Sequence, residues 1–244
     1  MLHARCKADV LKTVIEAIST LVDEAKFNVT TDGISIKAVD PAHVAMVEVT
    51  LRKSAFEEFK AEGMELGIDM DKFKDVIKLA ANDDELDLNY DTENHCLFVK
   101  IGNLTRRMSL VDSSGMADPK VPKLDLPGHV TIASGEIEKG IKAAEAVSDH
   151  VALIASPQAF ELLAEGDTDT VHLKLDKSHL PALDVKENVK SLFSLDYFSN
   201  MVRSAKGSQG IHLNIGNDYP VKIDFDIAGG NGHVTYLLAP RIES

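Results

Sequence analysis

The hydrophobic pattern of the chain changes between two periods, which predicts strands interrupted by short helices. Residues 66–70 (LGIDM) and 221–227 (VKIDFDI) carry apolar side chains at nearly every second position, as half-buried strands do. The segments that begin at Asp9 and Asp71 repeat their apolar residues every three or four positions, which is the period of an amphipathic helix. This mixture predicts an α+β fold.

The two halves of the sequence match each other at an offset near 126 residues, which predicts two tandem copies of one fold. The helical segment Asp71–Lys78 matches Asp196–Arg203 at an offset of 125. The earlier helical segment 10–14 matches 137–141 at an offset of 127. Each half is therefore expected to contain two helices, with strands before, between and after them.

Each of the four predicted helices begins with an acidic residue. A carboxylate at this position can accept hydrogen bonds from free backbone N–H groups, and it faces the positive end of the helix dipole. We therefore expect these acids to cap their helices. They are Asp9, Asp71, Glu136 and Asp196.

Residues 112–128 (DSSGMADPKVPKLDLPG) follow neither period and contain Pro119, Pro122 and Pro127, three of the eight prolines in the chain. Proline fixes φ and removes a hydrogen-bond donor, so this segment is expected to be an extended, semi-rigid linker. It divides the chain into an N-terminal domain, residues 1–111, and a C-terminal domain, residues 129–244.

The charge of the chain is strongly negative overall but balanced in the predicted helices. Of 244 residues, 26 are basic and 39 acidic, so the formal charge is 26 − 39 = −13, which excludes a generally basic nucleic-acid binder. The four helical segments contain eight bases and eight acids, so the whole excess lies outside them. Bases on one amphipathic helix are typical of an ordinary solvated face. Their recurrence on four helices favours a shared role.

Several functional classes find little support in the composition. The 13 aromatic residues form no cluster, so a platform on which bases stack is not expected. Cys6 and Cys96 lie in apolar, strand-like surroundings without metal-ligand spacing, which favours a reduced cytosolic protein. No signal peptide or span of about 20 apolar residues is present, so we expect no membrane association.

An enzyme is the rival functional class. Asp69 with Asp71, the acids at 83–85, and His95 suggest a metal cluster, but no further histidine or cysteine completes the set, and solvated acids are favoured. No nucleophile and base are recognisable, and residues 229–232 (GGNG) indicate a tight hairpin and not a phosphate loop. We expect no catalytic residue, metal or cofactor.

Three separated segments resemble the proliferating cell nuclear antigen family of sliding clamps, in its archaeal form. They are residues 39–51 (VDPAHVAMVEVTL), the proline-rich linker, and residues 237–243 (LLAPRIE). The resemblance runs from end to end. It implies a homotrimeric ring around duplex DNA, with helices lining the hole and antiparallel sheets outside, that tethers DNA polymerase and confers processivity on the chromosome. A ring-forming binding module or scaffold that does not act on DNA is the alternative.

The size of such a ring is consistent with duplex DNA. Helices packed side by side lie roughly 8–10 Å apart, so twelve of them would leave a bore of roughly 28 Å, whereas eight would leave about 15 Å. B-form DNA is about 20 Å across. Three chains, and not two, would therefore admit a duplex.

The resemblance also implies three sets of functional residues. The bases that would face DNA, and hold phosphates without reading sequence, are Lys12, Lys74, Lys78, Lys139, Lys142, Arg203 and Lys206. The pocket that would bind short peptides with hydrophobic and aromatic residues is lined by Val39, His43, Val44, Met46, Leu126, Pro127, Pro220, Ala239, Pro240 and Ile242. The subunit interface, where 103–111 would meet 169–177 of a neighbour, would pair Arg106 and Arg107 with Asp167 and Asp169.

The partners that the family implies are duplex DNA, a clamp loader, and DNA polymerase, a flap nuclease and ligase, the last three through such peptides. Packing of a loop against a sheet is the alternative reading of the pocket residues. Thr13, Ser19 and Asp196 stand where eukaryotic clamps often have bases, so attraction of DNA is expected to be weaker here.

Overall fold

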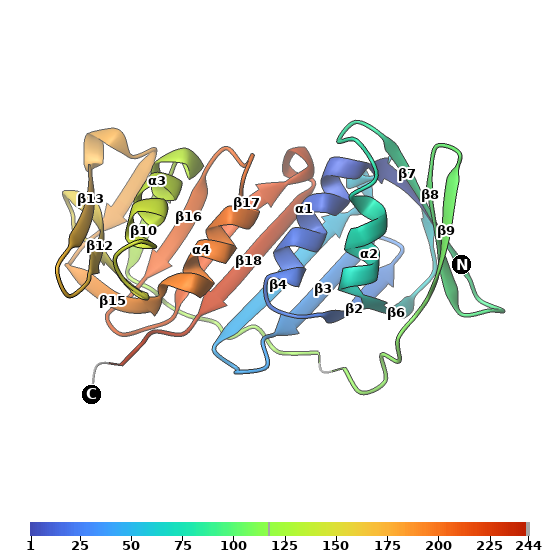
Figure 1. The fold of residues 1–244 in the computed structure, drawn as a ribbon, viewed down its shortest axis with the longest axis horizontal. Helices are drawn as coiled ribbons and strands as arrows, with labels where there is room; N and C mark the ends of the chain where they lie inside the picture. Colours follow the sequence, from blue (N-terminus) through green and yellow to red (C-terminus); the bar gives the residue numbers. More distant parts are fainter. Residues whose placement is uncertain (117, 243–244) are drawn as a thin grey trace. The chain divides into compact units, whose positions relative to one another are not determined.

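The order of helices and strands in the first half of the chain is repeated in the second half (Figure 1). The computed structural model describes residues 1–116 and 118–242. The contacts divide the chain into unit 1, Met1–Lys120 with Asp226–Val234, and unit 2, Val121–Phe225 with Thr235–Ser244. The predicted α+β fold with two tandem similar halves is confirmed.

Each half of the described chain contains nine strands and two α-helices in the same order. The first half consists of β1 (Leu2–Lys7), α1 (Ala8–Ser19), β2 (Glu24–Thr30), β3 (Gly33–Val39), β4 (Ala45–Arg52), β5 (Glu58–Ala61), β6 (Met64–Asp69), α2 (Met70–Ile77), β7 (Glu85–Asp91), β8 (Cys96–Ile101) and β9 (Leu104–Ser109). The second half consists of β10 (Gly128–Ile132), α3 (Ser134–Ala144), β11 (His150–Ala155), β12 (Ala159–Glu165), β13 (Thr170–Asp176), β14 (Ala182–Val185), β15 (Val189–Ser194), α4 (Leu195–Ser204), β16 (Ile211–Ile215), β17 (Val221–Ile227) and β18 (Gly232–Leu238).

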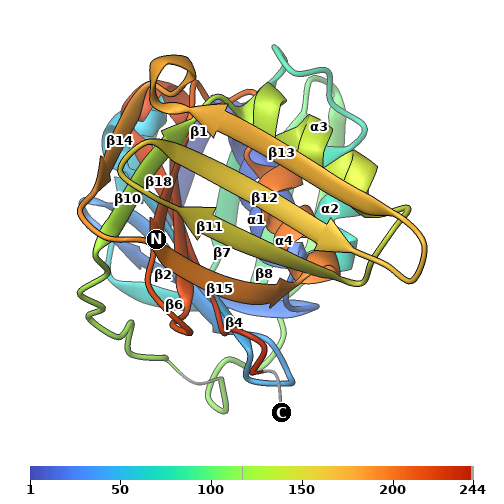
Figure 2. The ribbon, with the colours of Figure 1, turned by 90° about the vertical axis from the view of Figure 1, so that its left-hand side faces the viewer.

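The strands of each half form two antiparallel runs with equivalent orders. In the first half these are β5-β1-β7-β8-β9 and β4-β3-β2-β6, and in the second half β14-β10-β16-β17-β18 and β13-β12-β11-β15. Figure 2 looks onto the last of these, with β13 at one edge. A pair of polar residues repeats with this topology: His3 lies 2.7 Å from Asn89, and His129 lies 2.5 Å from Asn214, ring Nδ1 to amide oxygen.

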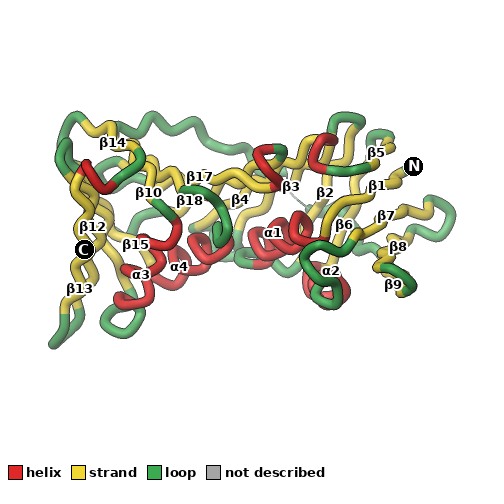
Figure 3. Tube along the Cα trace, turned by 90° about the horizontal axis from the view of Figure 1, so that it is seen from above, coloured by secondary structure: helices red, strands yellow, loops and turns green. Residues whose placement is uncertain are grey.

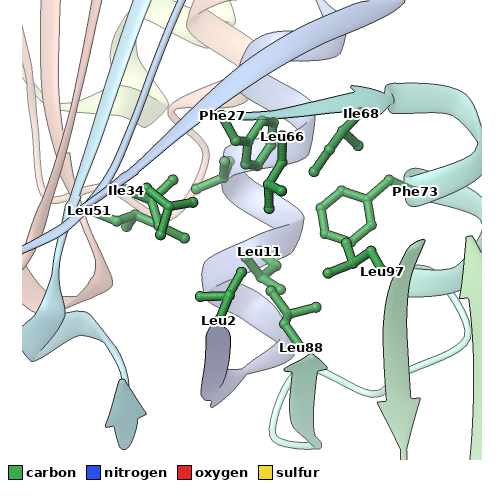
Figure 4. A pocket seen from close by; sticks show the side chains of 12 residues that line it. Leu2, Leu11, Phe27, Ile34, Leu51, Leu66, Ile68, Phe73, Leu88 and Leu97 are labelled. Carbon is green, nitrogen blue, oxygen red and sulfur yellow. The ribbon is translucent and has the colours of Figure 1, made fainter. Parts of the chain in front are cut away.

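The helices of each unit lie together on one side of its strands, as seen in Figure 3. In unit 1 the two helices and both runs of strands enclose a core in which Leu11 and Phe73 are buried (Figure 4). The rings of Phe27 and Phe73 meet edge to face with centroids 6.3 Å apart. The space left between these side chains is about 10 Å³, so this interior is packed core and not a ligand pocket.

The four acids lie in the first turns of their helices, as expected, and Asp9 accepts a hydrogen bond of 2.8 Å from the Val10 N–H, but none of the four is the N-cap residue. Asp9, Glu136 and Asp196 lie in the first turns of α1, α3 and α4, whose N-cap residues make no side-chain cap hydrogen bond. In α2 the capping residue is Asp69, which accepts a hydrogen bond of 2.9 Å from the Lys72 N–H. Each helix starts directly after a strand or, in α3, one residue later, and its first residue lies earlier than the periodic pattern indicates.

The offset between the first helices of the two halves also needs correction. α1 begins at Ala8 and α3 at Ser134, an offset of 126 and not 127. Val10 and Leu11 are adjacent and both apolar, so either can be matched with Ile137, and hydrophobic periodicity does not fix the register to one residue.

The predicted hairpin at residues 229–232 is confirmed. A turn over Ala228–Gly230 joins β17 to β18, and Gly229 and Gly230 adopt φ angles of 62° and 86°. Only glycine adopts this left-handed region without strain, which explains the glycine pair. Among the described residues, no helix is long and apolar enough to cross a membrane.

Candidate functional site

The bases predicted to face DNA all lie on the four helices or within two residues of their ends. The helices pack in pairs, α1 against α2 in unit 1 and α3 against α4 in unit 2. In each helix the apolar face is buried, so the polar face that carries the bases points away from the core. Each unit therefore presents one pair of helices with basic side chains.

In unit 1, two of these bases bind uncharged acceptors. Lys12 donates from Nζ to the Ala80 carbonyl at 2.6 Å and to Asn82 Oδ1 at 2.9 Å, which ties α1 to the loop after α2. Lys74 donates to the Ser19 hydroxyl at 3.3 Å. The acceptors in these hydrogen bonds carry no charge and so do not neutralise the two lysines. Lys78 is exposed at the end of α2.

In unit 2, three of the four bases are paired with acids. Lys139 lies 2.7 Å from Glu136 and Lys142 lies 4.0 Å from Glu138, at spacings of three and four residues on α3. Arg203 of α4 binds Glu145, the C-cap residue of α3. The α3 pairs can be read from sequence spacing. The Glu145 pair cannot, because its members are 58 residues apart, and sequence reasoning missed it.

The predicted partner-binding residues of unit 1 surround the loop between β3 and β4. Val39 ends β3, Met46 is buried on β4, and Val44 is 37% exposed at the loop. His43 adopts a positive φ of 58°. The structure thus brings these four residues to one loop, with Val44 turned toward solvent.

A buried carboxylate, missed from the sequence, holds this loop. Asp40 is 2% exposed and accepts hydrogen bonds from the backbone N–H groups of Ala42, Val44 and Ala45 at 3.0, 2.8 and 2.6 Å. The Asp-Pro sequence is a turn signal that could have identified it. Asp40 fixes the backbone on which His43 and Val44 are carried.

The other predicted partner-binding residues belong to unit 2. Leu126 is 3% exposed, Pro127 is exposed, Pro220, Ala239 and Pro240 are half-buried, and Ile242 is 84% exposed. The Arg241 N–H binds the Leu192 carbonyl at 2.7 Å, which holds this C-terminal segment on β15.

Tyr219 is an aromatic neighbour of this set that the sequence did not single out. It precedes Pro220 and is 58% exposed. Gly216 approaches both Tyr219 and Leu126 so closely that a Cβ at this glycine would lie 3.2 Å from each. Unit 2 therefore brings Leu126, Tyr219 and Pro220 together.

The predicted interface residues lie on or beside two edge strands, β9 and β13. Arg106 and Arg107 are on β9, and Arg107 Nε donates to Cys96 Sγ at 3.2 Å. Asp167 and Asp169 lie exposed in the turn between β12 and β13. Asp167 also lines an open polar hollow of about 390 Å³ with Glu145, Asp149, His150 and Glu165.

Two of the acids that suggest a metal cluster make structural contacts instead. Asp69 caps α2 and forms an ion pair of 2.7 Å with Lys72, which together lower its pKa. Asp84 accepts from the Ala81 N–H at 2.7 Å. Within residues 1–116 and 118–242, no group of three or more potential ligands could hold a metal ion.

Comparisons with known proteins agree over the whole chain. Residues 1–114 match the model of the proliferating cell nuclear antigen N-terminal domain, and residues 120–241 match that of its C-terminal domain. The chain is 48% identical to a DNA polymerase sliding clamp of Methanocella arvoryzae and 43% identical to that of Methanococcoides burtonii, each over the full length of both chains.

Solved structures give the same result. The A. fulgidus proliferating cell nuclear antigen, solved with the C-terminal region of FEN-1 bound, superposes with a TM-score of 0.94 at 35% identity over all of both chains. The Thermococcus kodakaraensis protein gives 0.91 at 26% identity over 99% of this chain and 100% of the other. The chain belongs to the proliferating cell nuclear antigen family of DNA polymerase sliding clamps.

Proposed function

We propose that three copies of this chain close into a ring around duplex DNA and tether DNA polymerase and other proteins of replication and repair. The ring slides because phosphate contacts carry no sequence information. It stays on DNA because it is closed, which confers processivity. A clamp loader opens the ring to place it on the chromosome.

The observation that carries this proposal is a contact that the β17–β18 hairpin makes with the end of β4. Among the described residues, the equivalent strands of the repeat, β9 and β13, make no such contact within one chain. The tip of the β17–β18 hairpin belongs to unit 1, where the Asn231 carbonyl accepts a hydrogen bond of 2.9 Å from the Arg52 N–H at the end of β4. Asn231 Oδ1 also accepts from the Ser54 hydroxyl at 2.8 Å. The last hairpin of the second half thus binds the fourth strand of the first half.

Among the described residues, the equivalent strands β9 and β13 pair with no further strand on their outer edges. In the repeat, β8–β9 corresponds to β17–β18, and β13 corresponds to β4. β9 and β13 are both the outermost strands of their sheets. Exposed strand edges of this kind can pair with a strand of another chain. An interface between two different surfaces of identical chains generates a ring when the rotation from one chain to the next adds up to a full turn. The acids at Asp167 and Asp169 and the bases at Arg106 and Arg107 have the charges that a β9–β13 contact between copies requires.

The partner-binding role rests on the two groups of residues described above. The linker at 112–128 would separate domains 1–111 and 129–244. The Asp40 loop of unit 1, and Leu126, Pro220 and the segment after β18 of unit 2, are the residues that we propose for peptide binding. The relative solved with the C-terminal region of FEN-1 supports a flap nuclease as one such partner. Polymerase and ligase would use peptides of the same chemistry, with aromatic and aliphatic anchors.

Retention on closed DNA tests the ring directly. The chain is loaded with a clamp loader onto a nicked circular plasmid, and half of the sample is then cut once to make it linear. A threaded ring stays on the circle and leaves the linear form within the time of a gel-filtration run. Equal retention on both forms contradicts the ring, as does a solution mass that remains near the 26.5 kDa of one chain. A trimer that does not associate with DNA at all supports the scaffold alternative.

A further inference from the structure

Glu145 links the two helices of unit 2 through a hydrogen bond and an ion pair. Its Oε1 accepts a hydrogen bond from the Ser199 hydroxyl and lies 2.5 Å from a guanidinium nitrogen of Arg203. Ser199 and Arg203 are four residues apart on α4, so they project from the same face. Ser199 is 1% exposed and therefore anchors the carboxylate at a fixed place.

The Arg203 guanidinium remains accessible to solvent while it is held. The side chains of Arg203 and Glu145 are 52% and 33% exposed. Ion pairs with this exposure are weak and are screened by salt. A DNA phosphate can therefore compete with Glu145 for Arg203, and the carboxylate lowers the gain from that exchange.

The internal repeat shows what the same place looks like without the acid. With offsets of 126 for the first helices and 125 for the second, Glu145 corresponds to Ser19, Ser199 to Lys74, and Arg203 to Lys78. The hydrogen bond between the helices is retained, since Lys74 donates to the Ser19 hydroxyl. The three residues carry a charge of +2 in unit 1 and zero in unit 2.

We propose that Glu145 is a counter-charge that competes with DNA phosphate for Arg203 and so limits the contact of α4 with DNA. This inference rests on the proposed function, in which these helices face the duplex. The consequence is that the attraction of phosphate differs between the two units of each subunit. The group in unit 1, with a charge of +2, holds phosphate more strongly than the group in unit 2, with a charge of zero. Glu145 acts through Arg203, so it is a positioning residue.

The repeat supplies reciprocal variants for the test. Glu145→Ser gives unit 2 the residue of unit 1, and Ser19→Glu does the reverse. The readout is the slope of log K against log[KCl] for binding of the full-length trimer to a short linear duplex, because each phosphate neutralised contributes about 0.9 to that slope. We expect Glu145→Ser to steepen the slope by up to about one per subunit and Ser19→Glu to flatten it by a similar amount.

Two controls separate this role from net charge and from folding. Glu93→Ser removes an exposed acid from the β7–β8 turn and should leave the slope nearly unchanged. Arg203→Gln combined with Glu145→Ser should abolish the steepening. The proposal is overturned if Glu145→Ser equals Glu93→Ser, or if the steepening persists without Arg203. Trimer mass and melting temperature, measured on each variant, verify that the ring is intact. Failure of the wild-type protein to stay on circular DNA would instead contradict the proposed function.

Discussion

The carboxylate of Asp40 accepts its shortest hydrogen bond, 2.6 Å, from the backbone N–H of Ala45, and the Asp40 N–H binds the Ala45 carbonyl at 3.0 Å in return. These two bonds close the base of the loop that carries His43 and Val44. The loop is therefore fixed before any partner binds, which reduces the entropy lost on binding.

Replacing Asp40 by alanine leaves the N–H groups of Ala42, Val44 and Ala45 without their acceptor. An unsatisfied buried donor costs about 1–3 kcal/mol, so the free energy of unfolding should fall by at least that amount. Affinity for a peptide with a glutamine, an aliphatic residue and two aromatics should fall at least tenfold, measured by calorimetry below the melting temperature. Asp32→Ala, in the exposed β2–β3 turn, should change neither quantity, and undiminished peptide affinity in Asp40→Ala would show that the loop does not contribute to binding.

Ring closure through β9 predicts that its arginines hold subunits together. Arg106→Glu with Arg107→Glu places four carboxylates against each other at the contact with Asp167 and Asp169, and like charges in an interface oppose association. Sedimentation at low protein concentration should then show monomers where the wild type is a trimer.

The matched control for this prediction is Lys60→Glu with Lys120→Glu. These lysines are exposed on β5 and in the linker, and the change in net charge is the same. The control should remain trimeric. An intact trimer in the arginine variant would exclude this account of the interface.

The sequence was sufficient for the fold because hydrophobic periodicity and the internal repeat both report on local structure. The strand at 221–227 and the helix near Phe73 follow from patterns within about ten residues, and the equivalence of the two halves follows from short segments of this kind that recur at an offset near 126. The positions of caps did not follow, since Asp69 belongs to the end of β6 and to the start of α2 together.

Contacts between distant segments account for what sequence reasoning missed at the candidate sites. The place of Lys12 on a polar helix face predicts only contact with solvent or DNA, whereas its partners Ala80 and Asn82 are about 70 residues away in the sequence. Glu145 meets Arg203 only because α3 and α4 pack together. Periodicity shows which face of a helix is exposed to solvent, but it does not show which charged side chains form ion pairs.

Lys12 should therefore contribute to stability as well as to DNA attraction. Lys12→Met keeps the length of the side chain and removes the hydrogen bonds to the Ala80 carbonyl and Asn82. A hydrogen bond to a charged group contributes about 1.5–3 kcal/mol when buried, and less at this half-buried site, so we expect a loss of about 1 kcal/mol in urea unfolding. Lys139→Met, whose ammonium pairs with Glu136 at an exposed site, should lose less than half as much. Equal losses would contradict a structural role for Lys12.

Stability should also depend on the protonation of His3, on strand β1 between β5 and β7. Its pKa is raised above the usual 6.5 by the hydrogen bond to Asn89, then by the hydrogen bond and charge of Glu58, with a smaller contribution from Asp87. A raised pKa in the folded state means that the stabilisation is fully present below pH 6.5 and is lost as pH rises through the folded value. The difference in unfolding free energy between wild type and His3→Gln should accordingly shrink as the pH rises above 6.5 and through the folded pKa of His3. Chemical unfolding at several pH values measures this difference, with an NMR titration of the His3 ring giving its pKa, and a difference that grows with pH would contradict the assignment.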